Sequence, residues 1–159
     1  ISGTQDKSAI VAKIPEYFPE SRFAVEIIYT KYSGHAAEIA HMAVEQNVDS
    51  VVAVGGDGTV NETARALIHS NVALGIVPSG SGNGLARHLY LPMNMEGALQ
   101  IISECNIHTL DYGLINKHSV FSPFLTLYST THRRILQRLS RFCTEFSGMR
   151  QKCDLRESP

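Results

Sequence analysis

The sequence predicts an α/β domain, in which a parallel β-sheet carries helices on both faces. Short runs of apolar, mostly β-branched residues recur along the chain, and segments with apolar residues at helical spacing separate them. Two of these runs, residues 51–54 and 72–77, end in glycine-rich turns that lead into helical patterns. Strands that alternate with helices in this way predict parallel pairing through right-handed crossovers.

The first third of the chain predicts a helix, a strand and a second helix. Residues 6–18 have helical spacing, and Pro15 leaves the end of that helix open. Residues 23–30 are rich in apolar and β-branched residues and predict a strand. Residues 35–46 predict the next helix, whose inward face is expected to consist of Ile39, Met42 and Ala43.

The middle of the chain repeats a strand–turn–helix unit. Residues 51–54 predict a buried strand, and the helix after its turn is expected through residues 60–68. The strand at 72–77 ends at Pro78 and leads through a second turn to a helix at 85–89. Asn94 is suited to cap a further helix, and a last strand is expected at 107–115.

A glycine-rich turn between a strand and a helix is suited to bind an anion. The first backbone N–H groups of the helix lack internal partners, and the helix dipole favours negative charge there. Asp57 would repel a phosphate at this position unless it faces Mg²⁺ or the hydroxyl group that is phosphorylated. Neither the Gly-Lys-Ser/Thr of the P-loop nor the dinucleotide Gly-x-Gly-x-x-Gly is present in these turns.

Taken alone, one such turn is as compatible with a tight structural connection as with phosphate binding. The carboxyl ends of parallel strands lie at one edge of the sheet, so Thr30 and both turns are expected at that edge. Two glycine-rich turns together can hold more of a polyphosphate than one, which favours nucleotide binding over plain turns.

Composition limits the class of protein. The chain has 159 residues, of which 43% are hydrophobic, and its formal net charge is −1. These values predict one packed domain, with or without a tail, and do not indicate a nucleic-acid binder. The sequence has no apolar run long enough to span a bilayer and no signal peptide. Cys105, Cys143 and Cys153 have no metal-ligand spacing, which suits a reduced cytoplasmic protein.

The charge is divided unevenly along the chain. Residues 1–116 hold 6 Lys and Arg against 12 Asp and Glu, whereas residues 117–159 hold 8 against 3. The second part also lacks the strand–turn–helix rhythm. It could be a basic extension that contacts a membrane or a partner, or a tail without a role, and the weak patterning favours the latter.

Three segments resemble motifs of the diacylglycerol kinase and sphingosine kinase family of lipid kinases. Residues 30–36 (Thr-Lys-Tyr-Ser-Gly-His-Ala) resemble the family's Thr-x-x-x-Gly-His-Ala. Residues 55–62 (Gly-Gly-Asp-Gly-Thr-Val-Asn-Glu) are similar to its Gly-Gly-Asp-Gly-Thr-x-Asn-Glu. Residues 78–87 (Pro-Ser-Gly-Ser-Gly-Asn-Gly-Leu-Ala-Arg) resemble its Pro-x-Gly-Thr/Ser-Gly-Asn-x-x-Ala-Arg.

The resemblance implies an ATP-binding domain over residues 1–116, with a fold similar to NAD kinase and phosphofructokinase. It implies that Mg-ATP binds there and that the γ-phosphate passes to the hydroxyl of a diacylglycerol or sphingoid-type lipid. Asp57 would be the catalytic base or the residue that organises Mg²⁺. The implied nucleotide-binding residues are Thr30, Gly34, His35, Gly55, Gly56, Asp57, Gly58, Thr59, Val60, Asn61, Glu62, Ser79, Gly80, Ser81, Gly82 and Asn83.

The chain also departs from the family pattern. Ile1-Ser2-Gly3 falls inside the family's first motif, so the first strand is expected to be missing. The Gly-x-Gly-x-Asp signature of the family's second domain does not appear, and residues 117–159 are therefore expected not to be the native continuation. The resulting hypothesis is the nucleotide-binding half of a two-domain lipid kinase, inactive alone.

The same hypothesis predicts a cytoplasmic protein with peripheral membrane contact. An uncovered sheet edge would favour pairing with a second copy, as a homodimer. Two other hypotheses remain: an NAD-kinase-like enzyme, and a non-catalytic nucleotide-binding module.

Overall fold

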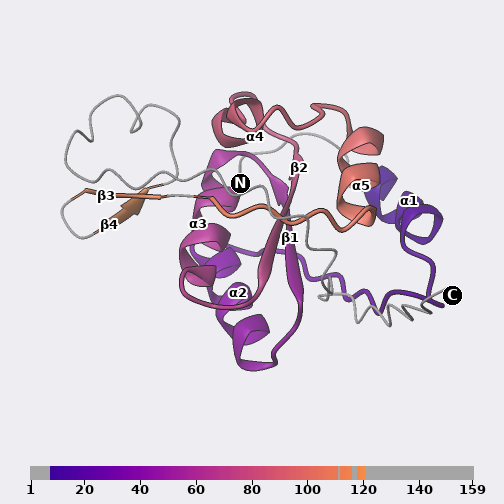
Figure 1. Cartoon of the computed structure of the whole chain (residues 1–159), viewed down its shortest axis with the longest axis horizontal. Helices are drawn as coiled ribbons and strands as arrows, with labels where there is room; N and C mark the ends of the chain where they lie inside the picture. The colour runs from indigo at the N-terminus through magenta and orange to yellow at the C-terminus, as the bar shows by residue number, and fades with distance from the viewer. Residues whose placement is uncertain (1–7, 111, 116–117, 121–159) are drawn as a thin grey trace, which may run out of the picture.

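The centre of the fold is a pair of parallel strands joined by one helix (Figure 1). The structure is a computed structural model, and it describes residues 8–110, 112–115 and 118–120. Strand β1 (Ser50–Gly55) pairs with β2 (Ala73–Pro78) in a register that runs from Ser50↔Ala73 to Gly55↔Pro78. Helix α3 (Asp57–Leu67) connects them, so the predicted strand–turn–helix unit is confirmed.

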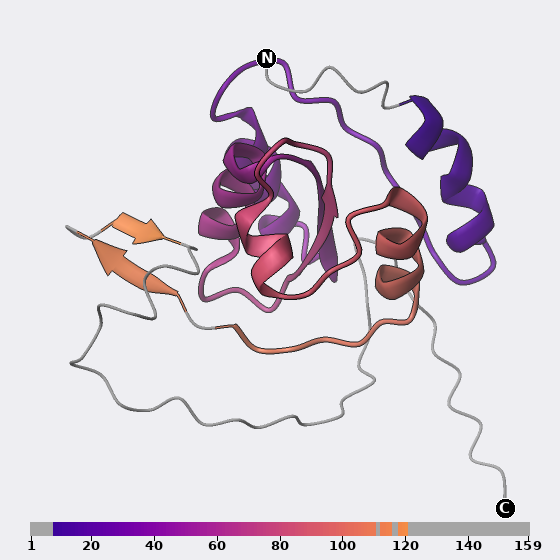
Figure 2. The same cartoon turned by 90° about the horizontal axis from the view of Figure 1, so that it is seen from above.

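Helices cover both faces of this pair, as Figure 2 shows from above. The helices other than α3 are α1 (Ser8–Tyr17), α2 (His35–Glu45), α4 (Gly84–His88) and α5 (Met95–Ser103). Side chains alternate along a strand, and Val52, Val54 and Val77 pack on the side of α1 and α5. Ala53 and Ile76 pack on the opposite side, against α3 and α4. The predicted α/β class with helices on both faces is confirmed.

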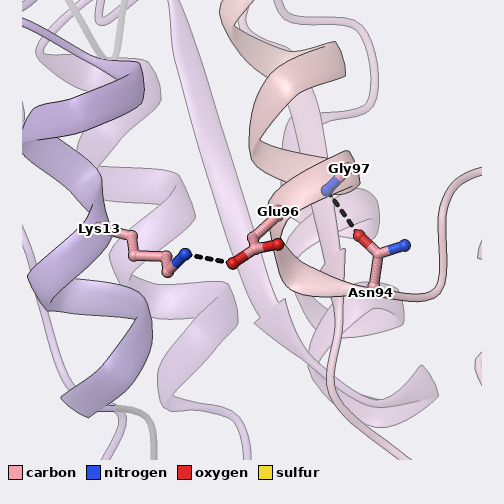
Figure 3. Close-up of polar contacts among 4 residues, drawn as sticks. All are labelled: Lys13, Asn94, Glu96 and Gly97. Carbon is pink, nitrogen blue, oxygen red and sulfur yellow. Dashed lines mark hydrogen bonds and ion pairs between the residues drawn. The ribbon is translucent and has the colours of Figure 1, made fainter.

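Helices α1 and α5 pack against each other beside the strands (Figure 3). Lys13 of α1 forms an ion pair with Glu96 in the first turn of α5, and this contact raises the pKa of Lys13. Asn94 caps α5 as predicted, because its side chain accepts a hydrogen bond of 2.7 Å from the backbone N–H of Gly97. Below these polar contacts, Ile10, Leu99 and other apolar residues form the largest described core cluster.

The predicted strand at residues 23–30 is wrong. The segment is not assigned to any strand, and the described parallel sheet consists of β1 and β2 alone. Val25, Ile27, Ile28 and Tyr29 are exposed, and the segment lines a cavity of about 490 Å³ together with β1, α1 and α2. Apolar, β-branched composition favours a strand only where a neighbouring strand provides backbone hydrogen bonds.

This cavity also explains the exposure of α2 on its predicted inward face. Ile39, Met42 and Ala43 all line the cavity, and Met42 is exposed rather than buried. The predicted inward face of α2 is wrong, because its buried residues are Ala36 and Ala40, and Ala40 packs against Ala66 and Leu67 of α3.

The end of the described chain is a short hairpin. Strand β3 (Gly113–Ile115) pairs antiparallel with β4 (His118–Val120), so only the last part of the strand predicted at 107–115 forms. The two paired strands lie on either side of the predicted boundary after residue 116. The rest of the predicted basic tail, from residue 121 onward, lies outside the described residues.

No helix in the described part of the chain has both the length and the apolar character needed to cross a bilayer.

Adjacent isoleucines on α5 provide a test of this packing. Ile102 is 5% exposed in the core cluster, whereas Ile101 is 36% exposed. We expect Ile102→Ala to lower the free energy of unfolding by about 2–5 kcal/mol through loss of buried surface and the cavity left behind. Ile101→Ala is the matched control and should lower it by less than about 1 kcal/mol, as measured by urea denaturation. Equal losses for the two variants would contradict the described orientation of α5.

Candidate functional site

The first glycine-rich turn places a helix N-terminus at the carboxyl end of β1. Gly56 is the N-cap of α3, in an extended conformation with φ −91° and ψ −171°, and makes no side-chain cap. The first-turn N–H groups of a helix have no intrahelical acceptors, and the positive end of the helix dipole lies there. Val60 N–H donates the first backbone hydrogen bond of the helix to Gly56 O, at 3.1 Å.

The second turn is held closed by its own asparagine. The Asn83 side chain accepts from Gly80 N–H at 3.0 Å and donates to Gly80 O at 2.7 Å. Asn83 itself has φ 54°, a left-handed conformation that asparagine tolerates better than most residues. Although it lies in a turn, Asn83 is buried. Its amide therefore fixes the loop at residues 80–83, and Asn83 is the N-cap residue of α4 without a side-chain cap hydrogen bond.

The two turns are in direct backbone contact. Ser79 N–H donates to Gly55 O at 2.8 Å, which continues the β1–β2 ladder into the turns. A Cβ atom added to Gly80 would lie 2.6 Å from the Cα of Gly56, closer than real side chains approach. Glycine is therefore required at position 80, whereas a Cβ atom on Gly56 would lie 3.3 Å from the Cα of Gly80, a tight but less severe approach. The contact combines two separate turns into one surface.

Asp57 connects the turns a second time. Its Oδ1 accepts a hydrogen bond of 2.6 Å from the backbone N–H of Gly84, at the start of α4. A Cβ on Gly82 would lie 2.5 Å from Oδ2 of the same carboxylate. Arg87 braces the turn from the other side, because its Nε donates to Gly82 O at 2.9 Å. Asp57 is exposed, and a carboxylate has further acceptor positions beyond the one used here.

A third segment, residues 30–35, lies beside α3. Ser33 Oγ is 3.4 Å from Glu62 Oε1, which brings this segment to the second turn of the helix. Lys31 N–H donates to His35 Nδ1 at 3.1 Å, and the Tyr32 ring stacks on the imidazole with centroids 4.5 Å apart. These contacts agree with the interpretation of His35 as a local hydrogen-bonding residue. The hydrogen bond from Tyr32 to Glu38 raises the pKa of Tyr32.

The structure thus brings most of the predicted residues to one end of the parallel pair. Val60 differs from the rest, because its side chain is buried in the core cluster behind the turn. Thr30 lines the large cavity, as does Thr59 of α3. The predicted residues that lie on the two connected turns or the first part of α3 are Gly55, Gly56, Asp57, Gly58, Thr59, Asn61, Glu62, Ser79, Gly80, Ser81, Gly82 and Asn83.

Three residues outside the predicted set contribute to this geometry. Gly84 donates to Asp57, Arg87 supports the second turn, and Ser33 approaches Glu62. The resemblance had included Gly84 and Arg87 in the matched segment, but it gave no indication that they contact the turns. Two of these contacts join residues distant in sequence, and periodicity reports none of the three.

A metal site made by the protein alone is not present in the part of the chain that the structure describes, where no group of three or more His, Cys, Asp or Glu side chains converges. Mg²⁺ in nucleotide sites is held by one or two carboxylates together with substrate phosphates. Asp57, beside two backbone turns, fits that kind of donor set.

The fold and the paired turns define a class, an α/β domain with a polar site at the carboxyl ends of two parallel strands. The chain belongs to the diacylglycerol kinase catalytic domain family, whose model matches residues 1–115. The family prediction made from the three motifs is therefore confirmed.

Individual relatives support the same assignment. A diacylglycerol kinase of Staphylococcus saprophyticus is 35% identical over 101 residues, which is 62% of this chain and 32% of that protein. The protein named "Probable lipid kinase YegS" of Escherichia fergusonii is 37% identical over 106 residues, 64% of this chain and 36% of that protein. This chain therefore spans about a third of the curated relatives it matches.

A solved structure has the same fold. The crystal structure of a diacylglycerol kinase from Bacillus anthracis superposes with a TM-score of 0.64 at 27% sequence identity. The match covers 74% of this chain and 44% of the other.

The contact between the turns predicts different effects for two glycines. Gly80→Ala would place a methyl group against Gly56, and we expect the free energy of unfolding to fall by about 1–3 kcal/mol. Gly58→Ala is the control, because a Cβ there meets nothing within 4 Å and alanine favours the helix by about 0.5–1 kcal/mol. Urea denaturation measures both. A Gly80→Ala variant as stable as the wild type would show that the turns are not in contact.

Proposed function

We propose that this chain is the nucleotide-binding part of a lipid kinase that transfers the γ-phosphate of ATP to a lipid hydroxyl. Membership of the diacylglycerol kinase catalytic domain family supports the reaction class. The observation that carries the proposal is the contact between the two glycine-rich turns, with Asp57 bonded across them. This arrangement brings the backbones of both turns and one carboxylate to the same place.

Each part of the site has a role in phosphoryl transfer. The N-terminus of α3 and the backbone N–H groups of the turns attract the phosphates and orient them. Asp57 lies where it can face the incoming hydroxyl or a metal ion, and Glu62 follows in the second turn of α3. Because phosphoryl transfer depends on positioning and charge neutralisation, a rigid pair of turns is suited to it.

Mg²⁺ would be held by Asp57 together with nucleotide phosphates, and it would neutralise charge on the transferred group. The other contributions to transfer would come from the side chains and backbone of this chain. Asp57 has one oxygen bonded to Gly84 N–H, which fixes the orientation of the carboxylate. A fixed orientation benefits either a general base or a metal ligand.

The segment at residues 30–35 would complete the nucleotide site from the α2 side. Thr30, Gly34 and His35 lie on this segment, and the Ser33–Glu62 contact joins it to α3. The proposed acceptor is a diacylglycerol or a sphingoid-type lipid. The cytoplasmic location and peripheral membrane contact proposed for the longer protein follow from such a substrate.

The first experiment measures phosphoryl transfer by a full-length protein, which contains this chain and is as long as the relatives. Labelled ATP and Mg²⁺ are offered with diacylglycerol, sphingosine or NAD, and product is quantified for each acceptor. Transfer to a lipid is expected. Transfer to NAD alone would favour the NAD-kinase-like enzyme, and tight Mg-ATP binding without transfer to any acceptor would favour a non-catalytic module.

Substitutions of Asp57 distinguish its role in phosphoryl transfer from its role in stability. Asp57→Asn keeps a side-chain oxygen that can accept from Gly84 N–H but removes the negative charge. We expect transfer by the full-length protein to fall by about 10²–10⁴-fold with little change in melting temperature.

Asp57→Ala removes both the charge and the hydrogen bond. It should lose the same activity and also destabilise the protein by about 1–3 kcal/mol, because the link between the turns is lost. Unchanged activity in Asp57→Asn would exclude a role for its charge as base or metal ligand.

A further inference from the structure

Tyr32 is an exposed aromatic residue whose ring is held in one orientation. Its hydroxyl donates a hydrogen bond of 2.6 Å to Glu38 Oε2 on α2. The ring stacks on the His35 imidazole, with centroids 4.5 Å apart and ring planes inclined by 22°. Tyr32 is nevertheless 55% exposed, because the imidazole covers only one face of its ring. We call this pair of residues the Tyr32–His35 stack.

His35 supports the tyrosine ring from behind. Its Nδ1 accepts a hydrogen bond of 3.1 Å from the backbone N–H of Lys31, which places the proton of the neutral imidazole on Nε2. His35 is also the first residue of α2, so its backbone is fixed by the helix. With the imidazole bonded to Lys31 and the tyrosine bonded to Glu38, both rings have little freedom left to lose when a ligand binds.

The stack contributes little to the hydrophobic core. Neither ring is part of a core cluster among the described residues. A flat aromatic surface that is fixed in place and open to solvent is suited to a flat ligand, because aromatic rings favour stacked contacts. The alternative is a purely structural role at the start of α2, which predicts that removal of the ring lowers stability and leaves ligand selectivity unchanged.

The stack lies beside the candidate site. Helix α2 packs against α3 (Figure 1), and Ser33 Oγ is 3.4 Å from Glu62 Oε1. At a rise of about 1.5 Å per residue, Glu62 lies roughly 8 Å along α3 from Asp57. In a nucleoside triphosphate, the ribose and the α-phosphate separate the base from the γ-phosphate by a distance of this order. Phosphates held at the two turns would therefore leave the base within reach of the segment that carries Tyr32.

We propose that the Tyr32–His35 stack holds the base of the nucleotide and selects purine nucleotides over pyrimidine nucleotides. The proposal rests on the proposed function and adds the means by which the base is recognised. Aromatic side chains bind bases through their π faces, and the strength of the stacking sets the preference among bases. The two fused rings of a purine offer more stacking area than the single ring of a pyrimidine, so a purine gains more from the exposed face of Tyr32.

Recognition by stacking has a consequence for the choice between ATP and GTP. A stacked ring contacts the face of a base and does not contact the hydrogen-bonding groups on its edge. Adenine and guanine differ in those edge groups, whereas their ring systems have the same size. The stack therefore predicts that ATP and GTP bind with similar affinity, and that CTP and UTP bind about ten-fold more weakly than either.

The test is nucleotide binding to the full-length protein, measured by isothermal titration calorimetry. The ligands are the Mg²⁺ complexes of ATP, GTP, CTP and UTP. Magnesium tripolyphosphate is the additional probe, because it carries the phosphates without a base and therefore reports on the turns alone. We expect the wild-type protein to bind both purine nucleotides about ten-fold more tightly than both pyrimidine nucleotides, and this comparison needs no substitution.

Substitutions then assign the preference to the ring. Tyr32→Ala should weaken ATP binding by about ten-fold, remove the difference between ATP and CTP, and leave tripolyphosphate binding unchanged. Tyr32→Phe loses the hydrogen bond to Glu38 but keeps the ring, so it should retain the purine preference. Tyr90→Asn is the matched control, because it removes another exposed tyrosine, and asparagine tolerates the left-handed φ of 54° at that position. The melting temperature of each variant is measured in parallel.

Several outcomes would overturn the proposal. Equal affinity for ATP and CTP in the wild-type protein would do so, as would a Tyr32→Ala variant that keeps the difference between them. A preference of more than about ten-fold for ATP over GTP would assign base recognition to edge contacts instead. A Tyr32→Ala variant with a lower melting temperature and weaker tripolyphosphate binding would assign the ring to the stability of α2. Absence of binding by tripolyphosphate and every nucleotide would overturn the proposed function as well, whereas nucleotide binding without a purine preference would overturn base recognition alone.

Discussion

The approach of Gly56 to Gly80 is the constraint on which the candidate site depends. It fixes the distance between two turns that follow different strands, and it leaves no room for a side chain at Gly80 and little room at Gly56. The parallel register of β1 and β2 brings the turns to the same level, and Ser79 N–H completes the ladder at Gly55 O. Asp57 then adds a charged hydrogen bond from the first turn to the start of α4. Backbone and side-chain contacts therefore hold the same geometry independently.

The sequence predicted the parts of the fold that depend on local patterns. The apolar strands, the crossover helix α3 and the Asn94 cap each arise from residues close together in the chain. The family could also be predicted from the sequence, because the three motifs retain their order and composition. Of the site, the residues on both turns could be named, but the pairing of Asp57 with Gly84 could not. That contact depends on how two turns meet in space.

The strand predicted at residues 23–30 failed for a related reason. A strand is stabilised by a neighbour, and composition alone cannot supply one. In the described chain the segment forms no strand, and its apolar residues line a cavity with β1, α1 and α2. The same cavity accounts for exposed Met42 on a helix face whose periodicity predicted burial. Errors in two elements therefore have one physical origin.

The described site is also compact along the chain. Both turns, the strands before them and the helices after them lie between Ser50 and His88 without interruption. Segments inherited through gene fusion or exon exchange are contiguous stretches of sequence. A single exchange of this stretch would transfer the paired turns together with the sheet register that aligns them. The surrounding parts of a recipient could then diverge, while the paired turns were inherited whole.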